Sequence, residues 1–157
     1  MSKERTFDIK HCYETDVKIK FSIDSGWTAR DELEAITPIL KETLIDYKLP
    51  CTLEMAELKA GGLFNATKIP CIVVTNREHP YDYLKLLITV VKQGSVALVE
   101  VYETGTSKEL KKLQIEEQKR RAGKLIIMNK HNAHALKEEQ GYYALVVRAL
   151  SEAYRAS

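Results

Sequence analysis

The sequence lacks the features that define several familiar classes of protein. Its 157 residues include three cysteines, an odd number, and none of them forms a Cys-x-x-Cys pair. A secreted disulfide scaffold is therefore not expected. The first residues lead into no apolar segment, and no apolar run approaches the roughly 20 residues of a membrane-spanning helix. We expect a cytoplasmic protein with no membrane partner.

Motifs of the common enzyme classes are also missing. The chain contains no GxSxG, P-loop, HExxH or GxGxxG pattern, which lowers the expectation for those enzymes. Cys51 and Cys71 lie at the starts of predicted strands in apolar company, where free cysteine usually serves as a small buried hydrophobe. The sequence therefore leaves the question of catalysis open and favours a non-enzymatic protein.

Histidines offer the one pattern that could suggest a metal. His131 and His134 would share one face of a helix, and His11 and Cys12 could complete a set of four ligands. A structural zinc site needs all four ligands in one place, and nothing in the sequence brings these together. We expect no metal and no cofactor.

Composition is that of an ordinary folded domain. Hydrophobic residues make up 45% and charged residues 29% of the chain, and a chain of this length buries a core without disulfides or metal. We expect residues 1–157 to form a single domain.

Hydropathy patterns predict the first elements of that domain. Asp16–Ile23 alternates apolar and polar residues, as a half-buried strand does. Thr28 is a suitable helix N-cap, and apolar residues at helical spacing follow it as far as Tyr47. Pro38 falls inside that stretch, so we expect one helical element with a break there.

The next segments predict three strands and a second helix. Cys51–Lys59 is expected to be a strand, and Cys71–Thr75 is expected to be a central strand because it is apolar on both faces. Pro80 to Gly94 is predicted as a helix, with Tyr81, Leu84, Leu87, Ile88 and Val91 in its buried stripe. Ser95–Tyr102 is the fourth expected strand.

This order, βαββαβ, is that of an α+β ferredoxin-like antiparallel sheet. The sequence thus predicts a ferredoxin-like core over residues 16–103, with the strands in the spatial order four-one-three-two. Residues 106–157 are predicted to form C-terminal helices that pack on this core, and the last of them covers 132–154.

A first candidate site follows from that topology. The loop after the first strand would share one end of the sheet with the hairpin near residue 61, next to a helix N-terminus that favours anions. A small anionic ligand is the expected occupant, although an ordinary capped helix start beside an ordinary hairpin explains the same residues. The residues concerned are Asp24, Ser25, Gly26, Trp27, Thr28, Lys59, Gly61, Gly62 and Asn65.

Two further surfaces remain open. Asn76, Arg77 and His79 would lie at the opposite end of the sheet, where they could hold an anion or simply form a solvated loop. Residues 107–124 have a net charge of +4, against +2 for the whole chain. Nucleic-acid binding by this basic helix is an alternative that we do not favour, because the helix lacks aromatic residues for base stacking. Its basic residues near the end are Lys119, Arg120, Arg121 and Lys124.

The sequence therefore supports three hypotheses about function. The leading one is a non-enzymatic ligand-binding or regulatory module that forms a homo-oligomer. The alternatives are a nucleic-acid-binding protein that uses residues 107–124, and an enzyme with an unrecognised site. None of the three is fixed by a motif.

Overall fold

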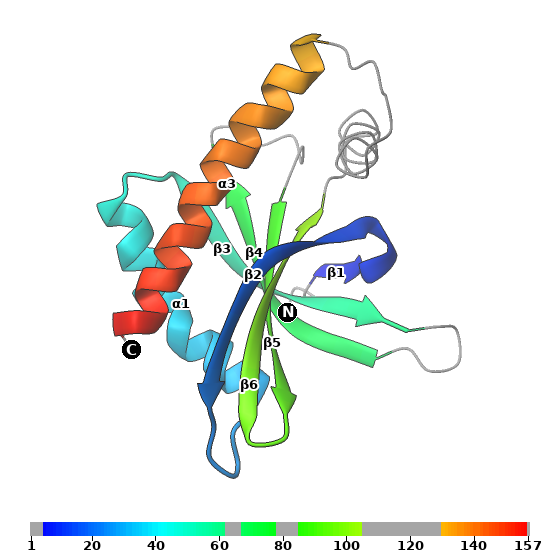
Figure 1. Cartoon of the computed structure of the whole chain (residues 1–157), viewed down its shortest axis with the longest axis vertical. Helices are drawn as coiled ribbons and strands as arrows, with labels where there is room; N and C mark the ends of the chain where they lie inside the picture. The colour runs from blue at the N-terminus through cyan, green and yellow to red at the C-terminus, as the bar shows by residue number, and fades with distance from the viewer. Residues whose placement is uncertain (1–4, 62–66, 78–84, 105–129, 157) are drawn as a thin grey trace.

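The computed structural model describes residues 5–61, 67–77, 85–104 and 130–156, with all their side chains except those of residues 16, 130–140 and 156. Figure 1 shows a curved sheet with two helices packed against one side of it. The elements in chain order are β1 (Arg5–Asp8), a short 3-10 turn η1 (Ile9–His11), β2 (Cys12–Ser22), α1 (Ala29–Asp46), β3 (Cys51–Ala60), β4 (Thr67–Asn76), β5 (Lys85–Gln93), β6 (Val96–Thr104) and α3 (Lys130–Ala156).

The ferredoxin-like prediction is wrong. The six strands lie in the order β1-β3-β4-β5-β6-β2, and the last four strands along the chain form an antiparallel meander. The long strand β2 pairs with β6 at one edge, and β1 pairs in parallel with β3 at the other. Among the described elements, only the helix α1 interrupts the strands, where a ferredoxin-like fold requires two helices.

The error lies in residues 80–94, where a helix was predicted. Lys85–Gln93 is strand β5. Leu86, Ile88 and Val90 face one side, and Leu87 with Thr89 faces the other. A strand buried on both faces is apolar at nearly every position, so a helical stripe can always be found within it. Gly94 does not end a helix; with a φ of 65° it starts the two-residue turn between β5 and β6.

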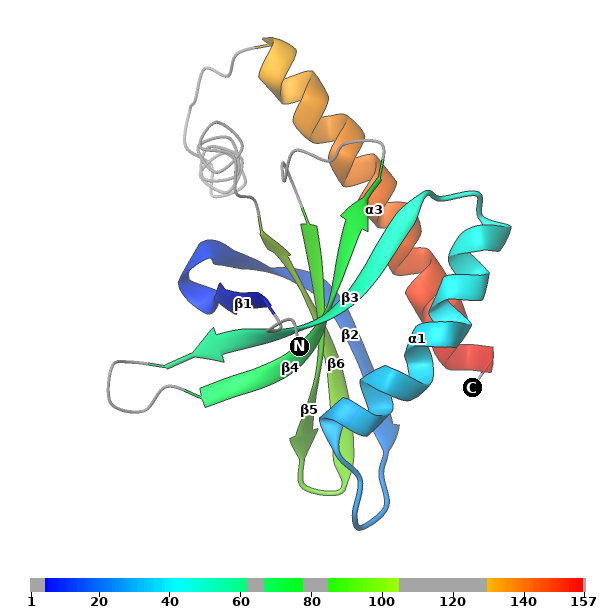
Figure 2. The same ribbon diagram turned by 180° about the vertical axis from the view of Figure 1, so that it is seen from behind.

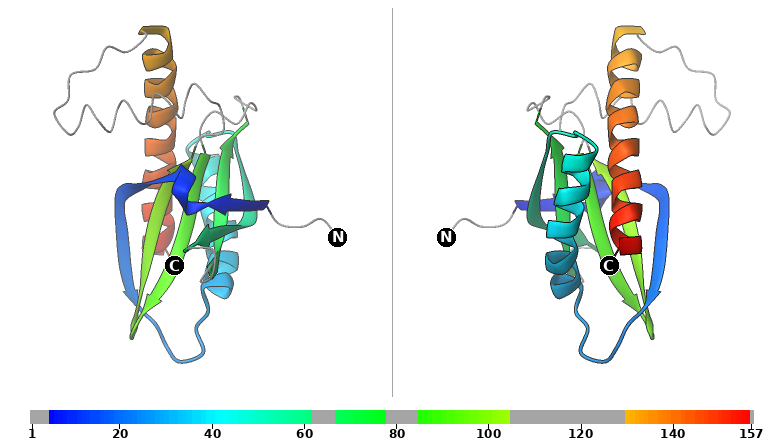
Figure 3. Two further views of the ribbon diagram at one scale, coloured as in Figure 1. Left: turned by 90° about the vertical axis from the view of Figure 1, so that its right-hand side faces the viewer. Right: turned by 90° about the vertical axis from the view of Figure 1, so that its left-hand side faces the viewer.

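Both helices pack on the same face of the sheet, which we call the helical face (Figure 3). Buried residues of α1 and α3 form one cluster there with alternate residues of β4, β5 and β6. The C-terminal helix was predicted to pack on the core, and α3 does so beside α1 on the helical face. The other face, here the second face, has its own smaller cluster. That cluster consists of Phe7, Ala56, Leu58, Cys71, Val73 and Leu87.

The second face is concave because the sheet must curl. β1 and β2 lie at opposite edges of the sheet, yet only the three residues of η1 join them. Strands spaced about 4.8 Å apart would separate these edges by about 24 Å in a flat sheet, whereas the short link reaches about 14 Å even when fully extended. The edges therefore approach each other, and Thr104 at the end of β6 donates a hydrogen bond to the carbonyl of His11 in η1 (3.0 Å). Figures 1 and 2 show β1 and η1 crossing over the sheet.

Several local predictions are confirmed. Thr28 is the N-cap of α1, and its hydroxyl accepts a hydrogen bond from the backbone N–H of Asp31. α1 is one helix with Pro38 inside it, although it runs on without the expected break. The expected central strand Cys71–Thr75 lies within β4, third of the six strands. The final helix is longer than predicted and begins at Lys130.

Candidate functional site

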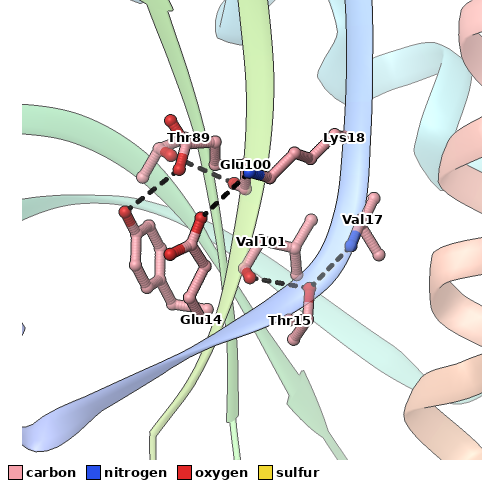
Figure 4. A network of polar contacts seen from close by, with 8 residues as sticks. Glu14, Thr15, Val17, Lys18, Thr89, Glu100 and Val101 are labelled. Carbon is pink, nitrogen blue, oxygen red and sulfur yellow. Dashed lines mark hydrogen bonds and ion pairs between the residues drawn. The ribbon is translucent and has the colours of Figure 1, made fainter.

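Polar side chains of three neighbouring strands meet on the second face of the sheet. We call this set the polar cluster, and Figure 4 shows it on β2, β5 and β6. Strand register places Glu14 opposite Tyr102, Lys18 opposite Glu100, and Glu100 opposite Thr89. The cluster thus combines two carboxyl groups, a phenol, an ammonium group and a hydroxyl. Its members are Glu14, Lys18, Thr89, Glu100 and Tyr102.

Members of the polar cluster contact one another through hydrogen bonds and an ion pair. The Tyr102 hydroxyl donates to Glu100 Oε2 at 3.4 Å, and the buried Thr89 hydroxyl donates to the Glu100 carbonyl at 3.0 Å. Lys18 Nζ lies 3.9 Å from Glu14 Oε1. Tyr102 also packs against the apolar cluster of the second face. The polar groups therefore border the apolar cluster of the second face, which we call the apolar floor. Polar groups beside an apolar surface are the usual composition of a small-molecule site.

A bulge in β2 sets Lys18 opposite Glu100. The register of β2 against β6 shifts between Glu14 and Lys18. Within the bulge, the Thr15 hydroxyl donates to the Val101 carbonyl (2.8 Å) and accepts from the Val17 N–H (3.3 Å), as Figure 4 shows. Bulges re-aim side chains and recur beside functional sites. Here the bulge sets Lys18 opposite Glu100, on the face that Glu14 also occupies.

The surroundings of Glu100 favour its protonated form. The pKa of Glu100 is raised above its ordinary value by burial, and a hydrogen bond with Glu14 and the charge of Glu14 add to this effect. Burial, with the charges of Glu100 and Glu14, also raises the pKa of Tyr102 to about 12. Two carboxylates at hydrogen-bonding distance cannot both ionise cheaply. Glu100 therefore holds its proton more readily than an isolated glutamate would.

This pairing predicts a pH-dependent effect of Glu100→Gln. Because the pKa of Glu100 is raised, the folded wild type binds the proton more tightly than the unfolded chain does. Wild-type stability therefore falls as the pH rises from the ordinary glutamate pKa through the raised one. The uncharged amide of the substitution mimics the protonated acid, so the variant should gain stability relative to wild type over that range. Since the pair is partly exposed, we expect on the order of 1 kcal/mol or less.

Urea unfolding of both proteins at about pH 4 and about pH 8 measures this difference. Glu54→Gln is the matched control, because Glu54 is an exposed glutamate on β3 that lies on the same face of the sheet. It should show no such trend. A stability difference between Glu100→Gln and wild type that stays constant with pH would contradict the paired carboxyl groups.

The first site expected from the sequence is not assembled. The loop Asp24–Thr28 adjoins the turn between β5 and β6, where Ile23 N–H donates to the Ser95 carbonyl (3.0 Å). The β3–β4 hairpin, which carries Lys59 and Gly61, points to another side of the molecule (Figures 1 and 2). Gly62 and Asn65 lie outside the described residues.

Within that loop, the side chains have structural contacts. Trp27 packs against the helical-face core and lies edge-on to Phe21, with ring centroids 6.4 Å apart. Its indole N–H donates to Glu32 Oε1 at 3.2 Å. Asp24, Ser25 and Gly26 are exposed in the turn. Anion binding by this loop remains a prediction.

The described residues of the second expected site lie at the end of β4. Asn76, at the end of β4, is buried, and its backbone N–H donates to the Tyr143 hydroxyl at 3.1 Å. Arg77 is exposed, and its backbone N–H donates to the Pro50 carbonyl at 2.8 Å, so this turn adjoins the start of β3 as expected. His79 lies outside the described residues, and from Lys85 onward β5 takes the place of the helix that was predicted to begin at Pro80.

The thiol of Cys51 lies close to that turn. Its sulfur is 2.7 Å from the Tyr142 hydroxyl on α3. Burial raises its pKa, and the hydrogen bond with Tyr142 and the positive charge of Arg77 only partly offset this. Burial likewise raises the pKa of the Cys12 thiol. Neither cysteine has the stabilised thiolate that a nucleophile requires, in agreement with a structural role for Cys51. Cys71 is fully buried within β4.

Several sequence predictions fall outside what the structure describes. These are the basic helix 107–124, with Lys119, Arg120, Arg121 and Lys124, and the side chains of His131 and His134. Among the described residues, no group of three or more histidine, cysteine or acidic side chains could hold a metal ion. The described helices include none that is both long enough and apolar enough to cross a membrane.

Comparison with known proteins assigns no relative to this chain. No family model, no curated protein and no solved structure matches it. Its function is therefore inferred from the geometry of the polar cluster.

Little in the sequence pointed to the polar cluster. Glu14 and Glu100 are 86 positions apart, and only the pairing of β2 with β6 brings them together. The alternation that predicted the first strand began at Asp16, beyond Glu14, so the first half of β2 was missed. Glu100 interrupts an otherwise apolar strand, and that interruption was the one available sign.

Proposed function

We propose that this protein is a non-enzymatic binding module and that the polar cluster on the concave second face is its ligand site. The single observation that carries the proposal is the convergence of Glu14, Glu100, Tyr102 and Thr89 beside an apolar floor. Mixed polar groups at the border of an apolar surface fix the orientation of small ligands. The cytoplasmic location and the homo-oligomeric state expected from the sequence belong to the same proposal.

The chemistry of the cluster selects the kind of ligand. Two carboxyl groups beside a phenol accept hydrogen bonds, and a positive group can replace the proton that the pair shares. Lys18 forms its ion pair with Glu14, and we assign Glu100, which the charge of Lys18 also influences, as the acceptor for such a group. The apolar side of Tyr102 and the adjoining floor suit a short hydrocarbon segment. A small organic amine or guanidine with an apolar part fits these features.

Calorimetric titration with spermidine and agmatine as probes tests the proposal. We expect binding in the micromolar to millimolar range, roughly −8 to −4 kcal/mol. At mildly acidic pH, binding should release a proton, so the measured enthalpy should vary with the ionisation enthalpy of the buffer. Glu100→Gln should weaken binding about tenfold or more, since a charge-assisted hydrogen bond is lost. Glu54→Gln is again the control.

Two outcomes would contradict the proposal. If the wild-type protein binds neither probe, small organic amines and guanidines are excluded as its ligands. If Glu100→Gln binds the probes as tightly as the wild type does, the binding site lies elsewhere. The nucleic-acid alternative depends on residues 107–124 and gives a different result, namely RNA or DNA binding that weakens steeply with salt. An enzyme with an unrecognised site would consume or convert a probe, which the titration followed by mass spectrometry would reveal.

A further inference from the structure

The second half of β2 forms a regular border of the sheet. β2 is an edge strand, and among the described residues only β6 pairs with it. Figure 3 shows β2 along one side of the sheet. The bulge of β2 lies before Lys18, and from Lys18 to Ser22 the register against β6 is continuous. Another strand can therefore pair with this stretch, which we call the open edge, without crossing the bulge.

The backbone of the open edge alternates in direction. The Ile23 N–H donates to the Ser95 carbonyl beside β6 (3.0 Å). Every second residue of an antiparallel strand shares this direction, so the N–H and C=O groups of Ile19 and Phe21 also point to β6. The residues whose backbone groups point outward are Lys18, Lys20 and Ser22. These groups form a template for the backbone of an added strand.

Charged and apolar side chains lie on opposite faces of the open edge. Lys18 and Lys20 are exposed on the second face. Ile19 and Phe21 pack against the core of the helical face and are half-buried. Exposed lysines discourage pairing with most strands, whereas opposite charges directly across a sheet stabilise it. The open edge therefore selects a strand with acids opposite the two lysines and apolar residues opposite Ile19 and Phe21.

The inner edge of β2 already makes a pairing of this kind. β6 sets Glu100 directly opposite Lys18, and Val99 opposite Ile19. The positive charge of Lys18 acts against the rise in the pKa of Glu100, so the two side chains attract each other. An acid across from a lysine, next to an apolar residue across from an apolar one, thus has a precedent within this sheet.

We propose that the open edge binds an extended acidic segment of a partner protein as an additional antiparallel strand. In the segment, apolar and acidic residues alternate, and the acids lie opposite Lys20 and Lys18. The backbone groups of these acids face the outward groups of β2, as in the hydrogen-bonded pairs of an antiparallel ladder. In such strand addition the main-chain hydrogen bonds supply affinity and the alternate side chains supply specificity.

Binding of a labelled peptide, Thr-Val-Glu-Val-Glu, followed by fluorescence anisotropy, tests the proposal. We expect a Kd in the micromolar to millimolar range that weakens as salt rises. Lys20→Glu should weaken binding about fivefold or more, because it sets like charges opposite each other. The peptide Thr-Val-Lys-Val-Lys should bind the wild type more weakly by a similar factor. Lys92→Glu, an equal charge change at an exposed site on β5, is the matched control and should bind the acidic peptide as the wild type does.

N-methylation of the peptide tests the geometry of the added strand. Methyl groups on the two glutamate nitrogens remove the N–H groups that face β2, so binding should be lost. Methyl groups on the two valine nitrogens, which point away from β2, should leave the Kd within a few-fold of its original value. Equal effects of the two modifications would contradict pairing through the backbone.

Hydrogen exchange locates the peptide on the protein. With the peptide bound, the amides of Lys20 and Ser22 should exchange more slowly, whereas those of Ile19 and Phe21, which face β6, should change little. Absence of binding at millimolar peptide overturns the proposal, and so does binding that is insensitive to Lys20→Glu or equal for the two peptides. Protection of the outward amides that rises with protein concentration alone would identify a second copy of this chain as the occupant and would also overturn it.

Discussion

Val73→Asp should lose at least about 4 kcal/mol of unfolding free energy, which is enough to unfold many natural domains. Val73 is 1% exposed and lies in the apolar cluster of the second face, with Leu87 as its neighbour on β5. An aspartate there would be a buried, unpaired charge. Its neighbour on β3 is Glu54, which would add repulsion.

Urea unfolding followed by circular dichroism measures this loss. Thr67→Asp makes the same acidic substitution at an exposed position of the same strand and should change stability by no more than about 0.5 kcal/mol. If Val73→Asp yields no folded protein, Val73→Thr keeps the experiment quantitative, since its buried hydroxyl should cost about 1–3 kcal/mol. A Val73→Asp protein that melts with the wild type would place residue 73 outside the core.

Tyr143→Ala should cost about 3–5 kcal/mol, the usual range for removing a buried aromatic side chain. Tyr143 is 1% exposed on α3, packs edge-on to Tyr142, and receives a hydrogen bond from the backbone of Asn76 on β4. It therefore fastens α3 to the sheet through both packing and polar contact. Tyr143→Phe retains the ring and loses only the hydroxyl, so it should cost about 1–2 kcal/mol.

Thermal or chemical unfolding of the two variants separates these contributions. Leu145→Ala is the matched control on the same helix, because Leu145 is 44% exposed, and it should have little effect. If Tyr143→Ala were as mild as Leu145→Ala, α3 would not pack on the helical face in the way the structure shows. A Tyr143→Phe loss equal to that of Tyr143→Ala would instead assign the whole effect to the hydroxyl.

The capping residue and the spacing of apolar residues predicted the helices, because interactions between residues close in sequence define a helix. Thr28 caps α1 because its hydroxyl reaches an N–H three residues ahead, and the helix stripe from Leu33 to Leu44 has a period that only a helix satisfies. The final helix was predicted from the same kind of period. In these helices the neighbours that decide the structure lie within a few residues along the chain.

Long-range pairing decided the rest. Residues 85–93 are apolar on both faces, and that pattern alone cannot distinguish a buried helix from a central strand; pairing with β4 and β6 makes them strand β5. The partner of β2 could equally not be predicted, since nothing near Glu14 in sequence points to Glu100. The sequence by itself determined the N-cap of α1 and the amphipathic stripes of the two helices. Only the tertiary structure decided the curl of the sheet and the polar cluster within it, because both arise from contacts between strands that the chain holds far apart.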